Sequence, residues 1–194
     1  PSHPETADEE VVVSISSLAV ETRDPLPQEG RVETVDAPHP NDDVVLGILC
    51  ARHHFNNPAA AYCQVCGRSM VHLTHNLVEG RRPTAGFLVF DDGSTYALDR
   101  SYIVGRDPSS GGADAVLRLT ENVDTLSAQH ARIGFVDWSV VVTDLGSTNG
   151  TFLWEPGSTE WTRLVSGEAT TVPPGSSVAF GHRTCQFESV TRSA

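Results

Sequence analysis

The segment Leu145-Gly146-Ser147-Thr148-Asn149-Gly150-Thr151 is the stretch that decides the fold of this 194-residue chain. It follows a β-rich run, Ser139 to Asp144, and its Asn-Gly pair taken alone is a signal for a hairpin turn. Two shorter motifs precede it at the ends of other β-rich runs, Ser127-x-x-His130 and Gly105-Arg106. We expect all three motifs to lie in loops along one edge of a β-sheet protein.

The runs around these motifs predict a sandwich. From about Ala85 onward, short β-rich runs are separated by turn residues at intervals of roughly ten residues, and no strong helical period interrupts them. Asp92-Gly93 is a hairpin signal between the first two runs. Because each sheet would have one buried and one wet face, two packed antiparallel sheets are the expected result. The predicted runs are Gly86–Phe90, Thr95–Leu98, Tyr102–Gly105, Val116–Leu119, Ala131–Val136, Ser139–Asp144, Ser177–Gly181 and Thr184–Glu188.

The side chains in the three motifs supply what a phosphorylated peptide needs. Arg106 offers a guanidinium fork to a dianionic phosphate, Ser127 a hydroxyl, and Asn149 an amide that can hold the main chain of a ligand. Each has a plainer explanation when taken singly, since Arg106 can be a surface arginine, Ser127 a turn residue and His130 a buried histidine with its hydrogen bonds satisfied. What favours the binding site is that all of these residue types lie at predicted loop ends on one edge.

The three motifs resemble those of forkhead-associated (FHA) domains. The resemblance covers about Gly86 to Val190 and continues through Val172–Gly181, which is similar to the penultimate turn and strand of the family. It implies a mainly β protein with an FHA-type antiparallel β-sandwich that binds phosphothreonine without catalysis. The implied phosphopeptide-binding residues are Arg106, Ser127, Thr148 and Asn149. The implied architectural residues are Gly105, His130 and Gly150.

The chain departs from the family pattern at Ala128, where the family often has arginine or asparagine, and the loop Asp107–Asp114 is acidic. Both departures would weaken phosphate binding. They support an alternative, a degenerate FHA fold that acts as a phospho-independent structural component of a larger complex. An enzyme using Ser127 and His130 as nucleophile and base is disfavoured, because no Gly-x-Ser-x-Gly elbow accompanies them.

A separate cluster of cysteine and histidine predicts a zinc site. Cys50, Cys63 and Cys66 are close in sequence, and the last two form a Cys-x-x-Cys-Gly knuckle that directs two sulfurs to one point. Spacing alone allows either His53 or His54 as the fourth ligand. The segment resembles the openings of short bacterial zinc ribbons, with Asn56 and Pro58 in matching places, and that resemblance implies His54.

Four protein ligands would fill the tetrahedron, so we expect Zn²⁺ to be structural, held by Cys50, His54, Cys63 and Cys66. Cys185 stands apart in a late apolar run and is not expected to take part. A segment this short has too little core to fold alone, and metal binding would supply much of its folding free energy.

We therefore predict an acidic arm or linker at 1–43, a zinc-ribbon-like module at 44–80 and an FHA β-sandwich at 85–191. The arm is rich in Pro, Glu and Asp, a composition typical of segments outside a core. The predicted partner is a threonine-phosphorylated protein or peptide, including a Ser/Thr kinase or its substrate.

Charge and hydropathy exclude several other partners. A formal net charge of -12 disfavours nucleic acid and anionic membrane surfaces. No run of about 18 apolar residues and no signal-peptide pattern is present, so we expect a cytoplasmic protein without direct membrane insertion. All 13 basic residues are arginine, a bias that favours a GC-rich, actinobacterial source.

Overall fold

The computed structural model describes residues 44–71, 76–110 and 114–190. These residues belong to one compact unit, Ala37–Ala194. The predicted acidic arm, 1–43, lies outside the described residues. Within the described ranges, no helix is long and apolar enough to cross a membrane.

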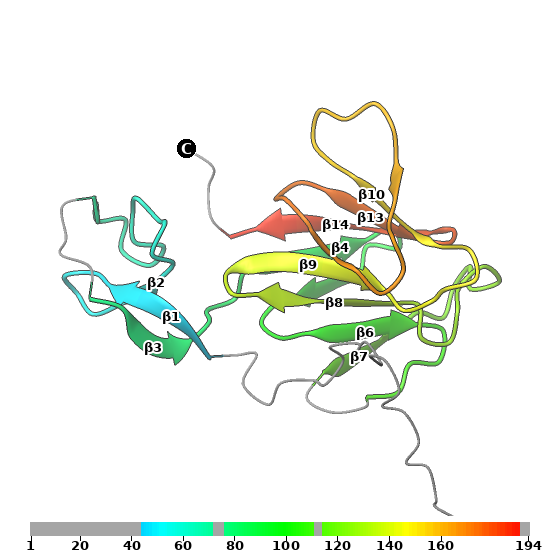
Figure 1. Ribbon diagram of the computed structural model, residues 1–194, viewed down its shortest axis with the longest axis horizontal. Coiled ribbons are helices and arrows are strands. Elements are labelled where there is room, and N and C mark those ends of the chain that lie inside the picture. The colour runs from blue at the N-terminus through cyan, green and yellow to red at the C-terminus, as the bar shows by residue number, and fades with distance from the viewer. Residues whose placement is uncertain (1–43, 72–75, 111–113, 191–194) are drawn as a thin grey trace, which may run out of the picture. The chain divides into compact units, whose positions relative to one another are not determined.

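The first described residues form a small three-stranded sheet, drawn in blue to green in Figure 1. Its strands are β1 (Val44–Leu49), β2 (Phe55–Asn56) and β3 (Val78–Arg81), in the order β2-β1-β3. Four buried residues pack together in a core cluster in this part: Ile48, Met70 and two cysteines, Cys50 and Cys63. We call residues 44–82 the small module.

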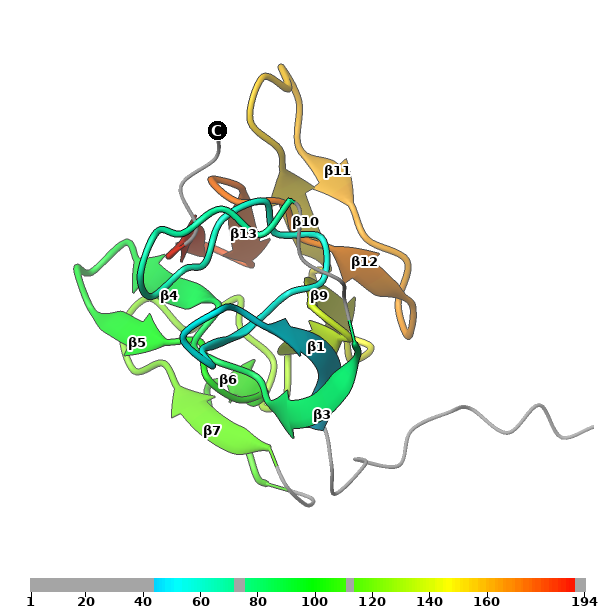
Figure 2. The ribbon, with the colours of Figure 1, turned by 90° about the vertical axis from the view of Figure 1, so that its left-hand side faces the viewer.

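Residues 85–110 and 114–190 form two sheets that enclose one apolar core. Figure 2 shows the ribbon of both sheets. The six-stranded sheet has the order β11-β10-β13-β14-β4-β5, and the five-stranded sheet has the order β12-β9-β8-β6-β7. We call this part the sandwich. Its strands are β4 (Gly86–Phe90), β5 (Thr95–Ala97), β6 (Tyr102–Gly105), β7 (Ala115–Arg118), β8 (Ala131–Val136), β9 (Ser139–Asp144), β10 (Thr151–Trp154), β11 (Thr162–Arg163), β12 (Ala169–Thr171), β13 (Ser177–Phe180) and β14 (Arg183–Ser189).

Alternating side chains build the sandwich core. Along β4, Leu88 and Phe90 are buried, and along β14, Cys185 and Phe187 are buried opposite them. The core comprises nineteen buried residues from both sheets. Each fully buried Leu or Phe side chain contributes about 1.5 to 3 kcal/mol, so the two sheets hold together through apolar burial. The loops at the sheet ends are free to carry polar side chains.

The predicted mainly β sandwich is confirmed, and the eight predicted runs correspond to β4–β9, β13 and β14. Three short strands, β10, β11 and β12, were not predicted. Strand β6 pairs with β7 in parallel, so the five-stranded sheet is mixed rather than purely antiparallel. The Asp92-Gly93 hairpin is present between β4 and β5, with Gly93 at φ 82°.

The Asn149-Gly150 pair does not close a hairpin between neighbouring strands. Strand β9 belongs to the five-stranded sheet, while β10 belongs to the six-stranded sheet. The chain therefore crosses from one sheet to the other through residues 145–150. This crossing places Thr148 and Asn149 at the edge of the sandwich, where both side chains are exposed.

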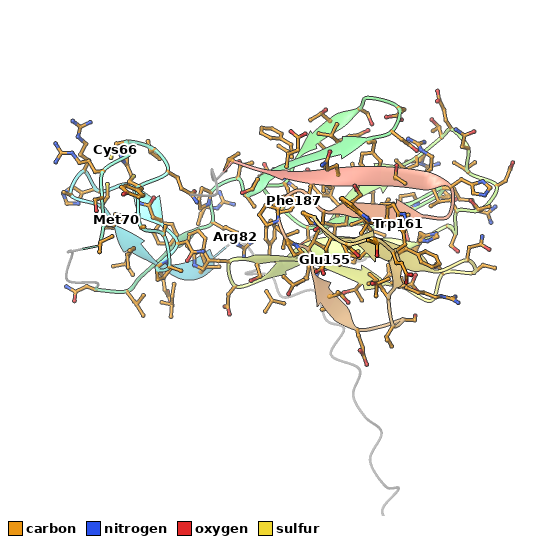
Figure 3. All side chains as sticks on the ribbon, turned by 90° about the horizontal axis from the view of Figure 1, so that it is seen from above. Cys66, Met70, Arg82, Glu155, Trp161 and Phe187 are labelled. Atoms are coloured by element: carbon orange, nitrogen blue, oxygen red, sulfur yellow. The ribbon has the colours of Figure 1, made fainter. Side chains whose placement is uncertain are left out.

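The small module contacts the sandwich through Trp138. Its indole N–H donates to the Leu46 carbonyl oxygen at 2.8 Å, and its ring lies 5.5 Å from that of Phe55, centroid to centroid. The Phe55 ring fits over Gly47 and Gly80, where a Cβ atom would lie 2.3 Å and 2.8 Å from ring carbons. Figure 3 labels Arg82 where the chain leaves the small module and enters the sandwich.

Candidate functional site

The three sequence motifs meet at one edge of the sandwich. Arg106 follows β6, Ser127 precedes β8, and Thr148 and Asn149 lie between β9 and β10. Together they border a hollow of about 270 Å³. Its lining residues are Arg106, Asp124, Thr125, Leu126, Ser127, Ala128, Thr148 and Asn149.

Backbone contacts hold the Arg106 loop against the Ser127 loop. The Arg106 N–H donates to the Ser127 carbonyl oxygen at 3.1 Å, and the Asp107 N–H donates to the Ala128 carbonyl oxygen at 3.2 Å. A Cβ atom on Gly105 would lie 1.9 Å from that same Ala128 oxygen. Only glycine permits this approach, so Gly105 allows the two loops to lie this close.

Side chains join the second and third loops. The Thr148 N–H donates to Oγ of Ser127 at 3.1 Å, and Nδ2 of Asn149 donates to the Thr125 carbonyl oxygen at 2.8 Å. Because Oγ of Ser127 acts as an acceptor in this bond, its own O–H proton remains available for a ligand. Asn149 likewise keeps its carbonyl oxygen and its second amide proton.

His130 ties the loops together from below, where its side chain is fully buried. The Ser127 N–H donates to Nδ1 of His130 at 3.1 Å, and Nε2 of His130 lies 3.2 Å from the Gly150 carbonyl oxygen. These two bonds require a neutral ring that carries its proton on Nε2. Burial lowers the pKa of His130, although the Gly150 carbonyl opposes the shift, so the neutral form is favoured.

Asp144 anchors the loop between β9 and β10, a role that sequence reasoning missed. Its buried carboxylate accepts hydrogen bonds from the Gly146 and Ser147 amides and from the hydroxyls of Ser147 and Thr151. Burial raises the pKa of Asp144, but these bonds outweigh burial and lower it overall. The signal in the sequence was Asp144 two residues before Gly146, the pattern of an Asx turn.

The two carboxylates of the loop that follows Arg106 are both paired with arginines. Asp107, which follows Arg106, pairs with Arg118 at 2.6 Å. Asp114 pairs with Arg132 at 2.8 Å through a partly buried contact. The repulsion that the acidic loop Asp107–Asp114 would exert on a phosphate is therefore reduced, because both carboxylates already face a guanidinium.

The cysteine and histidine cluster lies in the small module, where Figure 3 labels Cys66 and Met70. Ligand atoms from Cys50, His54, Cys63 and Cys66 all lie within 4.8 Å of one another. Nδ1 of His54 is 3.5 Å from the Cys50 sulfur and 3.6 Å from the Cys63 sulfur, and the Cys50 and Cys66 sulfurs are 3.9 Å apart. Sulfurs bound to one tetrahedral zinc lie about 3.8 Å apart, so the cluster could hold such an ion.

His53 stands outside this cluster, exposed and at φ 61° in the turn after Cys50. The structure thus brings His54, and not His53, to the three sulfurs. Burial raises the pKa of Cys63, but hydrogen bonds from the Cys66 and Val65 amides outweigh burial and lower it to about 6. A thiol of this kind is readily ionised, as a metal ligand must be. A hydrogen bond from the Arg68 backbone lowers the pKa of Cys66, but burial and the Cys63 and Cys50 sulfurs outweigh it and raise this pKa overall.

Asn56 joins the two halves of the cluster and is fully buried. Its Nδ2 donates to the His54 carbonyl oxygen at 2.6 Å, and its Oδ1 accepts from the Gln64 N–H at 2.9 Å. Asn56 therefore fixes the histidine loop against the Cys63–Cys66 knuckle. By contrast, complete burial in the sandwich raises the pKa of Cys185 to about 12, and Cys185 is no part of the cluster.

Comparison with known proteins gives a family for the sandwich. Among curated proteins no match was found. The chain is similar to the FHA domain of the CT664 protein from Chlamydia trachomatis, with 28% identity over 57% of this chain and 100% of that chain, and a TM-score of 0.42. It is also similar to Mycobacterium tuberculosis EmbR in complex with a low affinity phosphopeptide, with 22% identity over 59% of this chain and 27% of that chain, and a TM-score of 0.43.

A third similar structure is the N-terminal FHA domain of Saccharomyces cerevisiae Rad53p in complex with a phosphothreonine peptide. Its identity is 16%, over 54% of this chain and 93% of that chain, and its TM-score is 0.41. Because every one of these TM-scores lies below 0.5, the assignment rests on the family model of the FHA domain, which matches residues 102–181. The match includes all three motifs, and the chain therefore contains an FHA domain.

Proposed function

We propose that the loop edge of the FHA domain binds a phosphothreonine peptide and that the chain is a non-catalytic reader of Ser/Thr kinase signalling. The phosphate would lie against Arg106, Ser127 and Thr148, and Asn149 would hold the peptide main chain. The partner is then a threonine-phosphorylated protein, such as a kinase or its substrate, in the cytoplasm. The FHA family match and the loop geometry support this proposal.

The observation that carries the proposal is that Arg106 has no ion-pair partner among the described residues. The sandwich has six arginines, and four of them form ion pairs with aspartates: Arg100, Arg118, Arg132 and Arg183. Arg106 is exposed beside the hollow, and its guanidinium forms no ion pair with any other described residue. In a chain of net charge -12, such a guanidinium is free to bind an external anion.

The groups beside Arg106 complete the coordination of a phosphate. The Ser127 hydroxyl can donate its proton to a phosphate oxygen while its Oγ keeps the bond from the Thr148 N–H. A phosphothreonine carries about -1.5 to -2 charges and three strong acceptor oxygens at pH 7. A guanidinium fork and a hydroxyl can satisfy these oxygens together, while Asn149 supplies an amide for the main chain.

The alternative of a phospho-independent structural component rested on Ala128 and on the acidic loop. Ala128 is exposed in the lining of the hollow and supplies no side-chain donor there. Asp107 and Asp114, however, are both paired with arginines. Of the two arguments, Ala128 remains, and Asp124, an exposed carboxylate in the lining of the hollow, also disfavours a phosphate there.

We also propose that the small module holds one structural Zn²⁺ through Cys50, His54, Cys63 and Cys66. The three sulfurs and one imidazole nitrogen match the ligand types that zinc prefers, and four protein ligands leave no position for a reacting water. The ion would fix the fold of the small module and take no part in peptide binding.

Titration calorimetry with a diverse set of phosphothreonine peptides and their unphosphorylated forms tests the reader function. We expect binding of phosphorylated peptides only. Arg106→Ala should weaken binding about thirtyfold, the equivalent of about 2 kcal/mol. Arg106→Lys should rescue it in part, because the charge remains while the planar fork is lost.

The matched control is Arg100→Ala, which removes an exposed arginine already paired with Asp99 and should leave peptide affinity unchanged. Binding that is equally tight without Arg106 would exclude this site. If the wild-type protein binds no phosphothreonine peptide at all, the alternative of a structural component takes the place of the reader.

A further inference from the structure

A second arginine lies beside the same loop. Arg163, on β11, is exposed, and its guanidinium covers the backbone at Gly150, the residue after Asn149. A Cβ atom on Gly150 would lie 2.7 Å from Nε of Arg163 and 3.0 Å from one of its terminal nitrogens. Figure 2 labels β11, and Figure 3 labels Trp161, the residue just before that strand.

Arg163 resembles Arg106 in its lack of an ion-pair partner among the described residues. These two are the arginines of the sandwich that form no ion pair with another described residue, whereas the other four are each paired with aspartate. The sandwich has more acidic than basic residues, so carboxylates are not scarce. Arg106 lies on the first of the three loops at this edge, and Arg163 lies on β11, beside the third loop. The two guanidinium groups without an ion pair thus border the same set of loops.

The contacts of Arg163 within the sandwich are weak ones. Its guanidinium carbon lies 5.9 Å from the centre of the Phe152 ring, near the outer limit of about 6 Å for a cation–π contact. Its side chain covers Gly150, where positive φ, at 84°, already favours glycine. Neither contact uses the hydrogen-bonding fork of the guanidinium, which remains available to an anion.

We propose that Arg163 binds a second anionic group on the phosphothreonine peptide, so that the protein prefers ligands that carry an acidic or phosphorylated residue near the phosphothreonine. This inference rests on the proposed reader function. The shared chemistry is a carboxylate or phosphate oxygen facing a guanidinium fork. The peptide reaches Arg163 by passing over Asn149 and Gly150, beside the group proposed to hold its main chain.

Asp124 restricts the peptide positions at which an acidic residue is favoured. It is exposed in the lining of the hollow, and no arginine is paired with it in the described part of the chain. A carboxylate of the ligand that approached Asp124 would be repelled, whereas one that approached Arg163 would be attracted. The gain from an acidic residue is therefore confined to the peptide positions that reach Arg163.

The test is a glutamate scan by titration calorimetry on the full chain. One phosphothreonine peptide with neutral flanks is compared with variants carrying a single Glu at each neighbouring position on either side. We expect at least one position at which Glu tightens binding about three- to fivefold, since an exposed ion pair contributes modestly. This ratio should fall toward one in about 0.5 M salt, where charges are screened within a few ångströms.

Arg163→Gln should abolish the ratio between the Glu and neutral peptides, and Arg163→Lys should retain part of it. Arg100→Gln, the matched control, should leave the ratio as in the wild-type protein. Thermal melts of all variants show whether a substitution has damaged the loop. The affinity ratio compares two peptides on the same folded protein, so a change in the ratio reports the lost contact. A phosphoserine at the best position shows whether phosphate is bound more tightly than carboxylate.

The outcomes distinguish this inference from the function on which it rests. If the neutral phosphothreonine peptide binds but no Glu position tightens binding, or the ratio persists in Arg163→Gln, the role of Arg163 is refuted and the reader function stands. If no phosphothreonine peptide binds in any form, the reader function fails and this inference fails with it.

Discussion

The small module and the sandwich are held together by different means. The apolar core cluster of the sandwich comprises nineteen buried residues, whereas that of the small module comprises four, two of which are the candidate metal ligands Cys50 and Cys63. Buried apolar area is enough to stabilise the sandwich, but not a module with so small a core. A part with little core needs another source of folding free energy, and a bound metal ion is the one that its side chains offer.

Removal of the metal should have the largest effect, because it should unfold the small module and leave the sandwich folded. We expect protein purified without added zinc to contain one zinc ion per chain, and Cys63→Ser to lose it. Structural zinc contributes about 10 to 16 kcal/mol in small domains at pH 7, so residues 44–82 should lose their fold while the sandwich keeps its own. Elemental analysis and two-dimensional NMR spectra measure both effects.

The control is Cys185→Ala, which should behave in the opposite way. Cys185 is buried in the sandwich core and lies outside the metal cluster. Its loss should leave the zinc in place and lower the free energy of unfolding of the sandwich by about 1 kcal/mol. Zinc that is absent from the wild-type protein, or fully retained by Cys63→Ser, would contradict the metal assignment.

The loop edge of the sandwich should be sensitive to a single added methyl group. In Gly105→Ala, the new Cβ would lie 1.9 Å from the Ala128 carbonyl oxygen, so the Arg106 and Ser127 loops must move apart. We expect a loss of about 3 kcal/mol in stability together with weaker phosphopeptide binding. Chemical denaturation and calorimetry check the two effects.

Gly93→Ala separates this clash from the general cost of replacing a glycine. Gly93 has φ 82°, yet no atom lies within 4 Å of an added Cβ. Its substitution should cost about 1 to 2 kcal/mol from backbone strain and leave peptide affinity unchanged. Equal stability of Gly105→Ala and the wild-type protein would mean that the loops do not approach so closely.

The stability of the sandwich should also depend on pH through His130. Its pKa is lowered by burial in the folded state, whereas the unfolded chain has a histidine pKa of about 6.5. The unfolded state then binds more protons than the folded state. The contribution of His130 to the free energy of unfolding is therefore fully present above about pH 6.5 and is lost as the pH falls through the pKa of the folded state. The slope from this one group is at most about 1.4 kcal/mol per pH unit.

Urea denaturation of the wild-type protein and of His130→Gln, from pH 7.5 down to 5, measures this slope. The difference between the two proteins should shrink as the pH falls, because glutamine does not titrate. Asp144, whose pKa is also lowered, loses its contribution only below its ordinary carboxylate range and does not interfere here. A difference that is constant with pH would show that His130 is not held in its neutral form.

The smallest expected effect concerns the contact between the two regions. Trp138→Phe keeps an aromatic ring against Phe55 but removes the hydrogen bond to the Leu46 carbonyl oxygen. We expect a loss of about 1 kcal/mol and separate melting of the small module ahead of the sandwich. Calorimetric melts of Trp138→Phe and the wild-type protein that show the same single transition would mean that this bond does not couple the two regions.

The sequence alone was sufficient for the class of fold and for the location of the loops. Strand runs and turn residues are local signals, since alternation and Asn, Asp or Gly at turns reflect the conformation of a few neighbouring residues. The same holds for the Cys63–Cys66 knuckle. The predicted boundaries of the three segments stay predictions, as do the roles of Arg106, Ser127, Thr148 and Asn149 in binding.

Only the tertiary structure could decide which residues act together. Spacing alone leaves His53 and His54 equivalent, and the turn after Cys50 directs only His54, the residue that the zinc-ribbon resemblance implies, to the sulfurs. The pairing of Asp107 with Arg118 depends on the parallel neighbours β6 and β7, and the position of Arg163 beside Gly150 depends on a short strand, β11, that has no clear signal. Such contacts join residues far apart in the chain. A local sequence pattern cannot predict them, because it depends only on neighbouring residues.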